Sequence, residues 1–333
     1  MPELLRSIRR TALADYELIV VDDCSTDNTA ALIRQAGGQT LIRLPQRSGP
    51  SRARNVGASR ARGDILVFVD ADVILPEQAD LLKEMCAVLR DCAEVSGVAT
   101  LSDVRPVVEN AIAYNNSIYQ KYYAERLLAG KERVVGRVPF FSTRLGAIRK
   151  NIFQASGGFD ENLGWYMTED GEFWLRCCER GYVLCLDRSF VHYHRYPFTF
   201  RKYIRSYLRA AYSRYFIGKT YRTRHDPSVS AAERVRRLLA FSLFCWPLSQ
   251  WWLSPSAAAT LGFGLLIALY CSFGKMGALV RAHVPRKYRA AWYAVYVFIT
   301  PYIIGGYCAG LIAYWRGKRL LRQPPSDLDF FSA

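Results

Sequence analysis

Residues 64–73 read DILVFVDADV, and this stretch decides the fold. Its β-branched and aromatic residues predict a buried strand, and Asp70 and Asp72 follow that strand directly. Residues 16–23 read YELIVVDD and repeat the pattern, so that Asp22 and Asp23 also follow an apolar run. The sequence therefore predicts two strands that each end in a pair of carboxylates.

Strand and helix signals alternate along the first 220 residues. Further strands are predicted at residues 40–44, 94–101, 183–186 and 190–193. Helices are predicted at residues 3–13, 51–61, 76–89, 104–129 (largely helical), 168–181 and 199–216. This alternation predicts an α/β fold with a parallel sheet, in which ligands bind beyond the carboxyl ends of the strands. Aspartates also terminate strands and cap helices without further function, but two pairs in register favour a binding site.

The composition limits the classes of partner. The 333 residues carry a formal net charge of +16, which suits nucleic acid, anionic lipid or a phosphorylated substrate. No zinc-finger spacing or RNA-binding aromatic signature occurs, so nucleic acid is not an expected partner. The nine cysteines include no CxxC pair, and this unpatterned set is typical of reduced thiols rather than of a disulfide framework or a zinc site.

The C-terminal third holds three apolar stretches, at residues 238–253, 257–273 and 290–315. The first two are short for a membrane crossing, which needs about 20 residues, and the third is long enough. Basic residues flank all three, so a hairpin of the first two satisfies the positive-inside rule, whereas a single crossing by the third does not. Pro301, Gly305 and Gly306 could break the third stretch into a re-entrant or interfacial segment. Buried core helices are the alternative for all three.

These boundaries predict four regions. They are a catalytic α/β domain at residues 1–220, a basic linker at 221–237, membrane-associated helices at 238–315, and a basic or polar cytoplasmic tail at 316–333.

Three stretches of the chain resemble the glycosyltransferases of family 2. They are YELIVVDDCSTDNT, SGPSRARNVGASRARGDILVFVDADV and GGFDENLGWYMTEDGEFWLRCCERG, at residues 16–29, 48–73 and 157–181. They occur in the family's order, within residues 4–216. The resemblance implies a GT-A fold, a Rossmann-like sheet with helices on both faces that serves nucleotide-diphospho-sugar transferases. It also implies an inverting transfer, and an apolar tail is common in members that act on lipid carriers.

The Asp70-Ala71-Asp72 loop is the predicted metal site. A hard divalent cation such as Mn²⁺ or Mg²⁺ prefers carboxylate oxygen and can stabilise a departing diphosphate. By resemblance, Asp72 is the direct metal ligand, and Asp70 binds the nucleotide sugar or a metal-bound water. The family often has a histidine near the metal or diphosphate, which makes His192 and His194 candidates. Because these two differ in distance to the site, only one is expected to reach it, and a surface position is equally expected for either.

The remaining candidates fall on the donor side, the acceptor side and the predicted helix at residues 168–181. Asp22 and Asp23 resemble the pair that recognises the base, with Asp22 preferred. Arg52, Arg54 and Asn55 border the donor site by resemblance or form a solvated basic helix face. Asp170 is the proposed general base, with Glu169 as its orienter, and Thr168 is the expected cap of their helix. The candidates for the acceptor side are Gly157, Gly158, Phe159, Asp160 and Trp174, although an aromatic residue such as Trp174 at this helical spacing is more often core.

The family pattern opens with an apolar strand and a Pro/Tyr/Asn-type loop, which would precede the helix at residue 3. We therefore expect that the recorded start lies downstream of the true one, or that the chain is a degenerate copy. The intact downstream motifs favour the first explanation.

These features predict an inverting glycosyltransferase at the cytoplasmic face of the inner membrane. The expected partners are a nucleotide-diphosphate sugar, a lipid-linked or polysaccharide acceptor, and membrane lipid. Two alternatives stay open. A sugar-nucleotide pyrophosphorylase also uses an α/β sheet and metal-binding acids, although no Gly-rich phosphate loop of that type stands near the N-terminus. The other alternative is a non-catalytic membrane scaffold of a polysaccharide assembly system.

Overall fold

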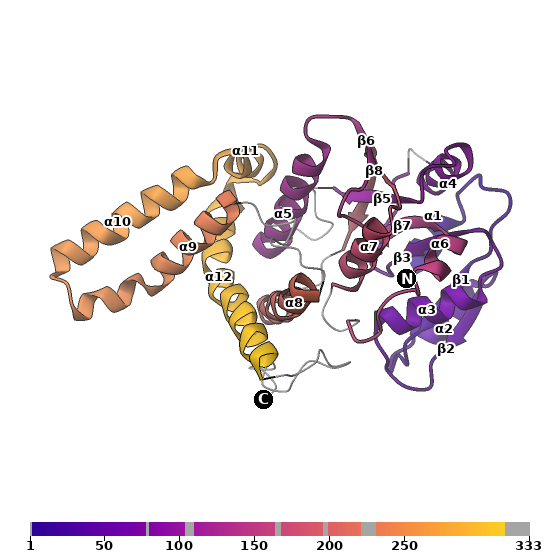
Figure 1. Cartoon of the computed structure of the whole chain (residues 1–333), viewed down its shortest axis with the longest axis horizontal. Helices are drawn as coiled ribbons and strands as arrows, with labels where there is room; N and C mark the ends of the chain where they lie inside the picture. Colours follow the sequence, from indigo (N-terminus) through magenta and orange to yellow (C-terminus); the bar gives the residue numbers. More distant parts are fainter. Residues whose placement is uncertain are drawn as a thin grey trace. The chain divides into compact units, whose positions relative to one another are not determined.

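The computed structural model describes residues 2–77, 80–103, 110–163, 168–195, 199–220 and 231–316 (Figure 1). They fall into two compact units. The first holds the described residues up to 103 and those from 124 to 195, and the second holds those from 110 to 123 and from 199 to 316. The predicted boundary at residue 220 differs from this division, because residues 110–123 and 199–220 belong to the second unit.

The first unit contains two sheets. In the smaller, β1 (Ile19–Asp22) pairs with β2 (Thr40–Arg43) in parallel. The larger has the order β3-β7-β5-β8-β4, with β6 also paired to β8. Its strands are β3 (Ile65–Val69), β4 (Val73–Ile74), β5 (Gly97–Ser102), β6 (Arg133–Gly136), β7 (Leu145–Arg149) and β8 (Leu184–His194).

The larger sheet is mixed, so the prediction of a parallel sheet is wrong in this part. β5 and β8 are parallel, but β7 lies between β3 and β5 and is antiparallel to both. The short run LGAIR at residues 145–149 gave no strand signal in the sequence. The two strands predicted at 183–186 and 190–193 form one continuous strand, β8.

Helices surround these sheets. They are α1 (Pro2–Ile8), α2 (Thr29–Ala36), α3 (Pro50–Arg60), α4 (Leu81–Asp91), α6 (Lys150–Ala155) and α7 (Glu169–Glu179). The predicted start of α4 at Pro76 is wrong, because the Asp80 carboxylate accepts a hydrogen bond from the Lys83 N–H (3.2 Å) and caps the helix there. The Thr168 side chain makes no capping hydrogen bond to α7, contrary to prediction.

Both faces of β3 are covered. Leu66 and Phe68 belong to one apolar cluster, whereas Ile65, Val67 and Val69 pack against another. This alternation follows from the period of two in a strand. Burial on both faces fixes β3, and with it the position of the Asp70-Ala71-Asp72 loop that follows.

The second unit is helical. It contains the first part of α5 (Ala111–Leu128), then α8 (Phe200–Thr220), α9 (Ala231–Cys245), the 3₁₀ helix η1 (Trp246–Trp251), α10 (Pro255–Ser272), α11 (Gly274–His283) and α12 (Arg286–Trp315). Among the described residues, α10 and α12 are long and apolar enough to cross a membrane. The break considered at Pro301 does not occur, since α12 is continuous and its Val295, Ile299 and Ile303 pack with Tyr203 and Ala211 of α8.

Candidate functional site

Arg54 joins the two acidic motifs of the first unit. Its guanidinium donates to Asp70 Oδ1 (2.6 Å) and to Glu169 Oε1 (2.7 Å). Burial alone would lower the pKa of Arg54, but the charges of Asp70 and Glu169 raise it above its ordinary value. Arg54 therefore stays charged, and it holds the loop after β3 beside the first turn of α7.

Asp72 pairs with His194, the last residue of β8. His194 Nε2 lies 3.1 Å from Asp72 Oδ1, and the Asp72 side chain is 41% exposed. Burial would raise the pKa of Asp72, but the hydrogen bond with His194 and the charges of His194 and Arg144 lower it overall. An ionised and accessible carboxylate is suited to bind a cation.

Glu169 and Asp170 begin α7. Burial raises the pKa of Glu169 to about 7, against the effect of Arg54, and Asp170 adds to the rise. Burial also raises the pKa of Asp170, against the charges of Arg54 and Arg144. The Asp170 carboxylate accepts hydrogen bonds from the N–H groups of Gly171 (2.8 Å) and Thr143 (3.4 Å). A carboxylate with a raised pKa is a better proton acceptor than an exposed aspartate.

Glu169 Oε2 is an unusual atom in this site. It is buried and has no hydrogen-bond partner within the part of the chain that the structure describes. Buried polar atoms almost always have a partner. This oxygen is therefore suited to receive a donor from a bound molecule.

His192 is not placed to bind a metal, and this part of the predicted site is not supported. Its ring is 1% exposed, and both nitrogens face hydroxyls: Nδ1 lies 2.8 Å from Thr100 Oγ1, and Nε2 lies 3.1 Å from Ser102 Oγ. Burial, Arg144 and His194 hold the pKa of His192 well below its usual value, so the ring is neutral. Of the two histidines, His194 is the one beside the acidic loop.

Asp22 and Asp23 hold the backbone of nearby turns. Asp22 Oδ1 accepts from the Ser25 N–H (2.9 Å), and Asp22 Oδ2 lies 3.4 Å from Arg43 Nε with its side chain fully buried. The Asp23 carboxylate accepts from the N–H groups of Ser48 (2.7 Å) and Gly49 (2.8 Å). The burial of Asp22 gives no support to the preference for Asp22 over Asp23 in recognising a base.

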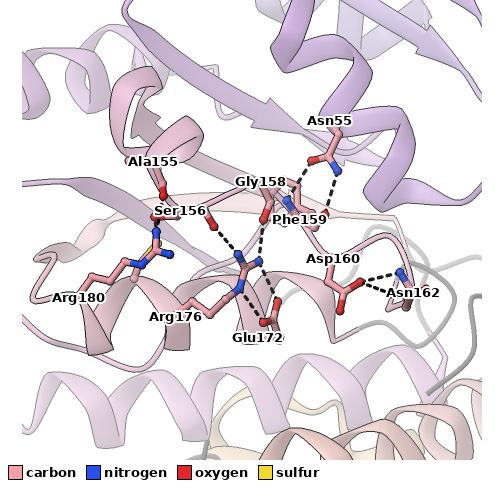
Figure 2. A network of polar contacts seen from close by, with 11 residues as sticks. Asn55, Ala155, Ser156, Gly158, Phe159, Asp160, Asn162, Glu172, Arg176 and Arg180 are labelled. Carbon is pink, nitrogen blue, oxygen red and sulfur yellow. Dashed lines mark hydrogen bonds and ion pairs between the residues drawn. The ribbon is translucent and has the colours of Figure 1, made fainter. Parts of the chain in front are cut away.

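The turn at residues 156–160 is held from two sides (Figure 2). The Asn55 amide forms a reciprocal pair with Phe159, donating to its carbonyl and accepting from its N–H (both 2.9 Å). From α7, Arg176 donates to the carbonyls of Ser156 and Gly158 (2.6 Å for Gly158). Gly158 has φ +68°, and a Cβ there would stand 2.8 Å from Asn55 Oδ1, so the turn requires glycine.

The other residues predicted at the acceptor side make contacts within the chain. Trp174 is fully buried, and its ring N–H donates to the Val138 carbonyl (2.8 Å), so its predicted place in an acceptor pocket is wrong. The Phe159 ring is buried and packs on Phe68 and Phe153. Asp160 accepts from the backbone and side chain of Asn162. Gly157 also has a positive φ, of 80°, in the same turn.

The basic residues of α3 were expected either to border the donor site or to form a solvated basic face. Arg54 is mostly buried, and Arg52 is half-exposed with Nη1 3.1 Å from Glu161 Oε2. The helix therefore does not present a solvated basic face at Arg54. Glu161, Arg144 and Arg176 also interact with residues of this site, and none of them was predicted from the sequence. Only Arg176 had a signal, its i,i+4 spacing from Glu172, with which it forms an ion pair (2.7 Å).

Some of the residues predicted to bind a metal are suited to a hard cation. No group of three or more His, Cys, Asp and Glu residues arranged for a metal occurs within the described ranges. Asp70 and Asp72 nevertheless supply accessible carboxylates on one short loop, with His194 adjacent. A cation that also takes oxygen ligands from a bound diphosphate needs few protein ligands. Asp70 and Asp72 therefore fit such an ion, and His192 does not.

Comparison with known proteins identifies this architecture. Residues 1–154 match the model of glycosyl transferase family 2. This part of the chain is thus a family 2 glycosyltransferase domain, and the resemblance seen in the sequence is confirmed there. Mannosyltransferase PcManGT from Pyrobaculum calidifontis, solved in complex with GDP-Man and Mn²⁺, has a similar fold, with a TM-score of 0.60 at 21% identity over 95% of this chain and 83% of that one. The GT-A fold prediction is confirmed.

Two curated relatives match a little over half of the chain. An uncharacterized glycosyltransferase of Haemophilus influenzae is 28% identical over 178 residues, which is 53% of this chain and 56% of the relative. The O-antigen chain rhamnosyltransferase WbaN of Salmonella anatum is 28% identical over 189 residues, 54% of this chain and 57% of the relative. The chain therefore spans little more than half the length of these relatives.

Proposed function

We propose that the protein is an inverting glycosyltransferase that moves a sugar from a nucleotide-diphosphate donor to a lipid-linked or polysaccharide acceptor. The observation that carries this proposal is the pair of contacts from Arg54 to Asp70 and Glu169. These contacts bring the acidic loop after β3 and the predicted base on α7 into one site. Carboxylates for a cation and a carboxylate base are the two requirements of such a transfer.

Asp70 and Asp72 form the donor side of the site. They would hold Mn²⁺ or Mg²⁺, which when bound supplies positive charge to a departing diphosphate. His194 fixes the orientation of the Asp72 carboxylate through its 3.1 Å contact. Arg54 fixes Asp70 in the same way, and Asp23 orders the loop that leads into α3. The complex of the structural neighbour with GDP-Man and Mn²⁺ supports this class of donor.

Asp170 is the proposed base. The acceptor hydroxyl oxygen bonds to the anomeric carbon, the bond from that carbon to the diphosphate oxygen breaks, and the hydroxyl proton passes to the Asp170 carboxylate. The raised pKa of Asp170 favours this proton transfer. Glu169 holds the first turn of α7 against Arg54 and keeps its second oxygen available to a hydroxyl of the bound sugar.

The relatives and the C-terminal helices support the proposed acceptor class and location. WbaN is named as an O-antigen chain rhamnosyltransferase, which supports a polysaccharide or lipid-linked acceptor. The apolar helices α10 and α12 support attachment to a membrane. Basic residues at the flanks of the apolar stretches favour the cytoplasmic face of the inner membrane.

The test uses membranes that contain the full chain and a panel of radiolabelled nucleotide sugars, with Mn²⁺ or with chelator. We expect label transfer from one donor, dependent on the metal. Asp170→Asn should abolish transfer and retain donor binding, whereas Asp91→Asn, at the exposed end of α4, should retain both. Transfer that is unchanged in Asp170→Asn would remove this residue from the mechanism, and no transfer from any donor with the wild-type chain would contradict the proposed activity.

A further inference from the structure

Helices α9 and α10, joined by η1, form a hairpin (Figure 1). Its outer surface is apolar. Residues 238–274 contain no Lys, Arg, His, Asp or Glu. Large apolar side chains point outwards along both legs and at the tip: Leu238, Phe244, Leu248, Trp251, Trp252, Leu261, Phe263, Leu266 and Tyr270. Trp251 and Trp252 are 78% and 79% exposed. A surface of this kind is suited to hydrocarbon rather than to water.

The hairpin is packed within itself. The Trp246 ring N–H donates to the Ala258 carbonyl (2.6 Å), which joins η1 to α10. Gly262 faces the same ring and leaves no room for a Cβ. Ser254 caps α10 by accepting from the Ala257 N–H (3.3 Å). The two legs therefore form one preformed element instead of two independent helices.

The base of the hairpin holds the charges. Glu233 is buried and accepts hydrogen bonds from Arg236 (2.8 Å), Arg237 (3.0 Å) and the Tyr296 hydroxyl (2.9 Å). Arg236 also donates to the Ser272 carbonyl at the end of α10 (3.0 Å). These contacts satisfy the charged groups within the protein and join the start of α9 to the end of α10 and to α12.

The length of the hairpin fits a bilayer. The 18 residues of α10 rise about 27 Å at 1.5 Å each, close to the hydrocarbon thickness of about 30 Å. The tip carries Gln250, Ser254 and Ser256 beside Trp251 and Trp252. Polar groups are costly in the middle of a bilayer, whereas Trp is enriched at the headgroup layer. The tip is therefore suited to the headgroups of the opposite leaflet.

Helix α12 is longer than α10, but its contacts argue against a crossing. Helix α8 packs along it, from Val295 to Tyr314. Gly306 and Gly310 face the backbone carbonyls of Leu208 and Tyr212 without space for a Cβ. The 21 residues of α8 include six basic residues and no acidic one: Arg201, Lys202, Arg205, Arg209, Arg214 and Lys219. A crossing by α12 would carry this basic helix into the hydrocarbon.

We infer that the α9–α10 hairpin crosses the bilayer and returns, and that α12 stays with α8 on the side of the hairpin's base. All the basic flanks then lie on one side, at Arg234, Lys275, Arg286 and Arg316, which a crossing by α12 would not allow. Phe298, Ile312 and Trp315 of α12 are exposed and can rest on the membrane interface. The inference rests on the membrane location in the proposed function, but its test does not depend on activity.

The test measures which face of sealed vesicles exposes single introduced cysteines in the full-length protein. The variants are Gln250→Cys at the tip, Arg286→Cys at the start of α12 and Trp315→Cys at its end, all at exposed positions. A membrane-impermeant maleimide is added to vesicles of either orientation, and peptide mass spectrometry locates the label. The native, exposed Cys92 in the first unit serves as the internal reference.

We expect Gln250→Cys to react from one face, and Arg286→Cys and Trp315→Cys from the other. Two results would overturn the inference. Reaction of Gln250→Cys from the same face as Arg286→Cys, or from neither face, would show that the hairpin does not reach the far leaflet. Reaction of Trp315→Cys and Arg286→Cys from opposite faces would show that α12 crosses. Equal labelling of Cys92, together with protection of the buried Cys86, verifies in every variant that the chain is folded, and a variant that fails this control is replaced by Ser256→Cys at the tip or Lys287→Cys in α12.

Discussion

The acidic site of the first unit and the hairpin of the second differ in their content of charged residues. In the site, Arg54 lies within hydrogen-bond distance of both Asp70 and Glu169 and balances part of their charge locally. In the hairpin, charged residues are absent between residues 238 and 274, and the charges at its base are satisfied by Glu233. The difference indicates that the first region is built for a charged ligand and the second for hydrocarbon.

Removal of Arg54 should have the largest effect. Arg54→Met leaves Glu169 buried beside Asp70 and Asp170 without its cation, and breaking a buried ion pair costs about 3–5 kcal/mol. Arg52→Met on the same helix is the matched control, because the Arg52 side chain is 47% exposed and surface pairs contribute about 0–1 kcal/mol. Chemical denaturation of both variants measures the difference. Equal losses of stability would contradict the role assigned to Arg54.

Acid should reduce transfer through the Glu169–Asp170 pair. Burial raises the pKa of Glu169 to about 7 and also raises that of Asp170. The base must be ionised, so kcat/KM should fall as the pH is lowered, with a midpoint above the ordinary pKa of an aspartate. A profile that stays flat down to pH 5 would contradict the burial of the pair.

Loss of the Asn55 amide should weaken the turn at residues 156–160. Asn55→Ala leaves the N–H and the carbonyl of Phe159 without their partner, and an unsatisfied buried group costs about 1–3 kcal/mol. Because the substitution lies on the predicted acceptor side, we expect it to raise the KM for the acceptor more than the KM for the donor. The control is Ser59→Ala on the same helix, whose hydroxyl makes an exposed contact. An equal effect on both KM values would mean that Asn55 acts through general stability alone.

The smallest effect should come from the glycines of α10. Gly262→Ala places a methyl group against Trp246, and such overpacking costs about 1–3 kcal/mol, partly offset by the better helix propensity of alanine. At Gly264, an added Cβ would meet no atom within 4 Å, so Gly264→Ala should stabilise the helix by about 0.5–1 kcal/mol. Thermal unfolding in detergent compares the two. A gain in both variants would contradict the packed hairpin.

The sequence predicted the regular parts of the fold well. The apolar runs at residues 65–69 and 19–22 appear as β3 and β1, and the motifs pointed to the family whose model matches residues 1–154. Strand β7 was not predicted, because LGAIR is short and shows no strand pattern in the sequence. The antiparallel insertion of β7 depends on pairing with strands about 50 and 80 positions earlier in the chain.

For the candidate site, the sequence could predict which residues take part but not the contacts between them. Asp70, Glu169 and Arg54 were singled out, but their mutual contacts depend on the approach of α3 to α7, which no local pattern encodes. His192 and His194 look equivalent in sequence, and their different neighbours separate them. Trp174 lies at a helical spacing that fits a core residue as well as a pocket, and packing against Phe141 decides the matter.

Helix α3 has a consequence for the synthesis of the protein. Asn55 and Arg54 find partners 104 and 115 positions further along the chain. During translation, the Asp70-Ala71-Asp72 loop therefore leaves the ribosome long before the segment that completes it. A nascent chain that stalls near residue 154 would contain the whole family match but neither the turn at residues 156–160 nor α7, so it could not yet assemble the proposed catalytic centre.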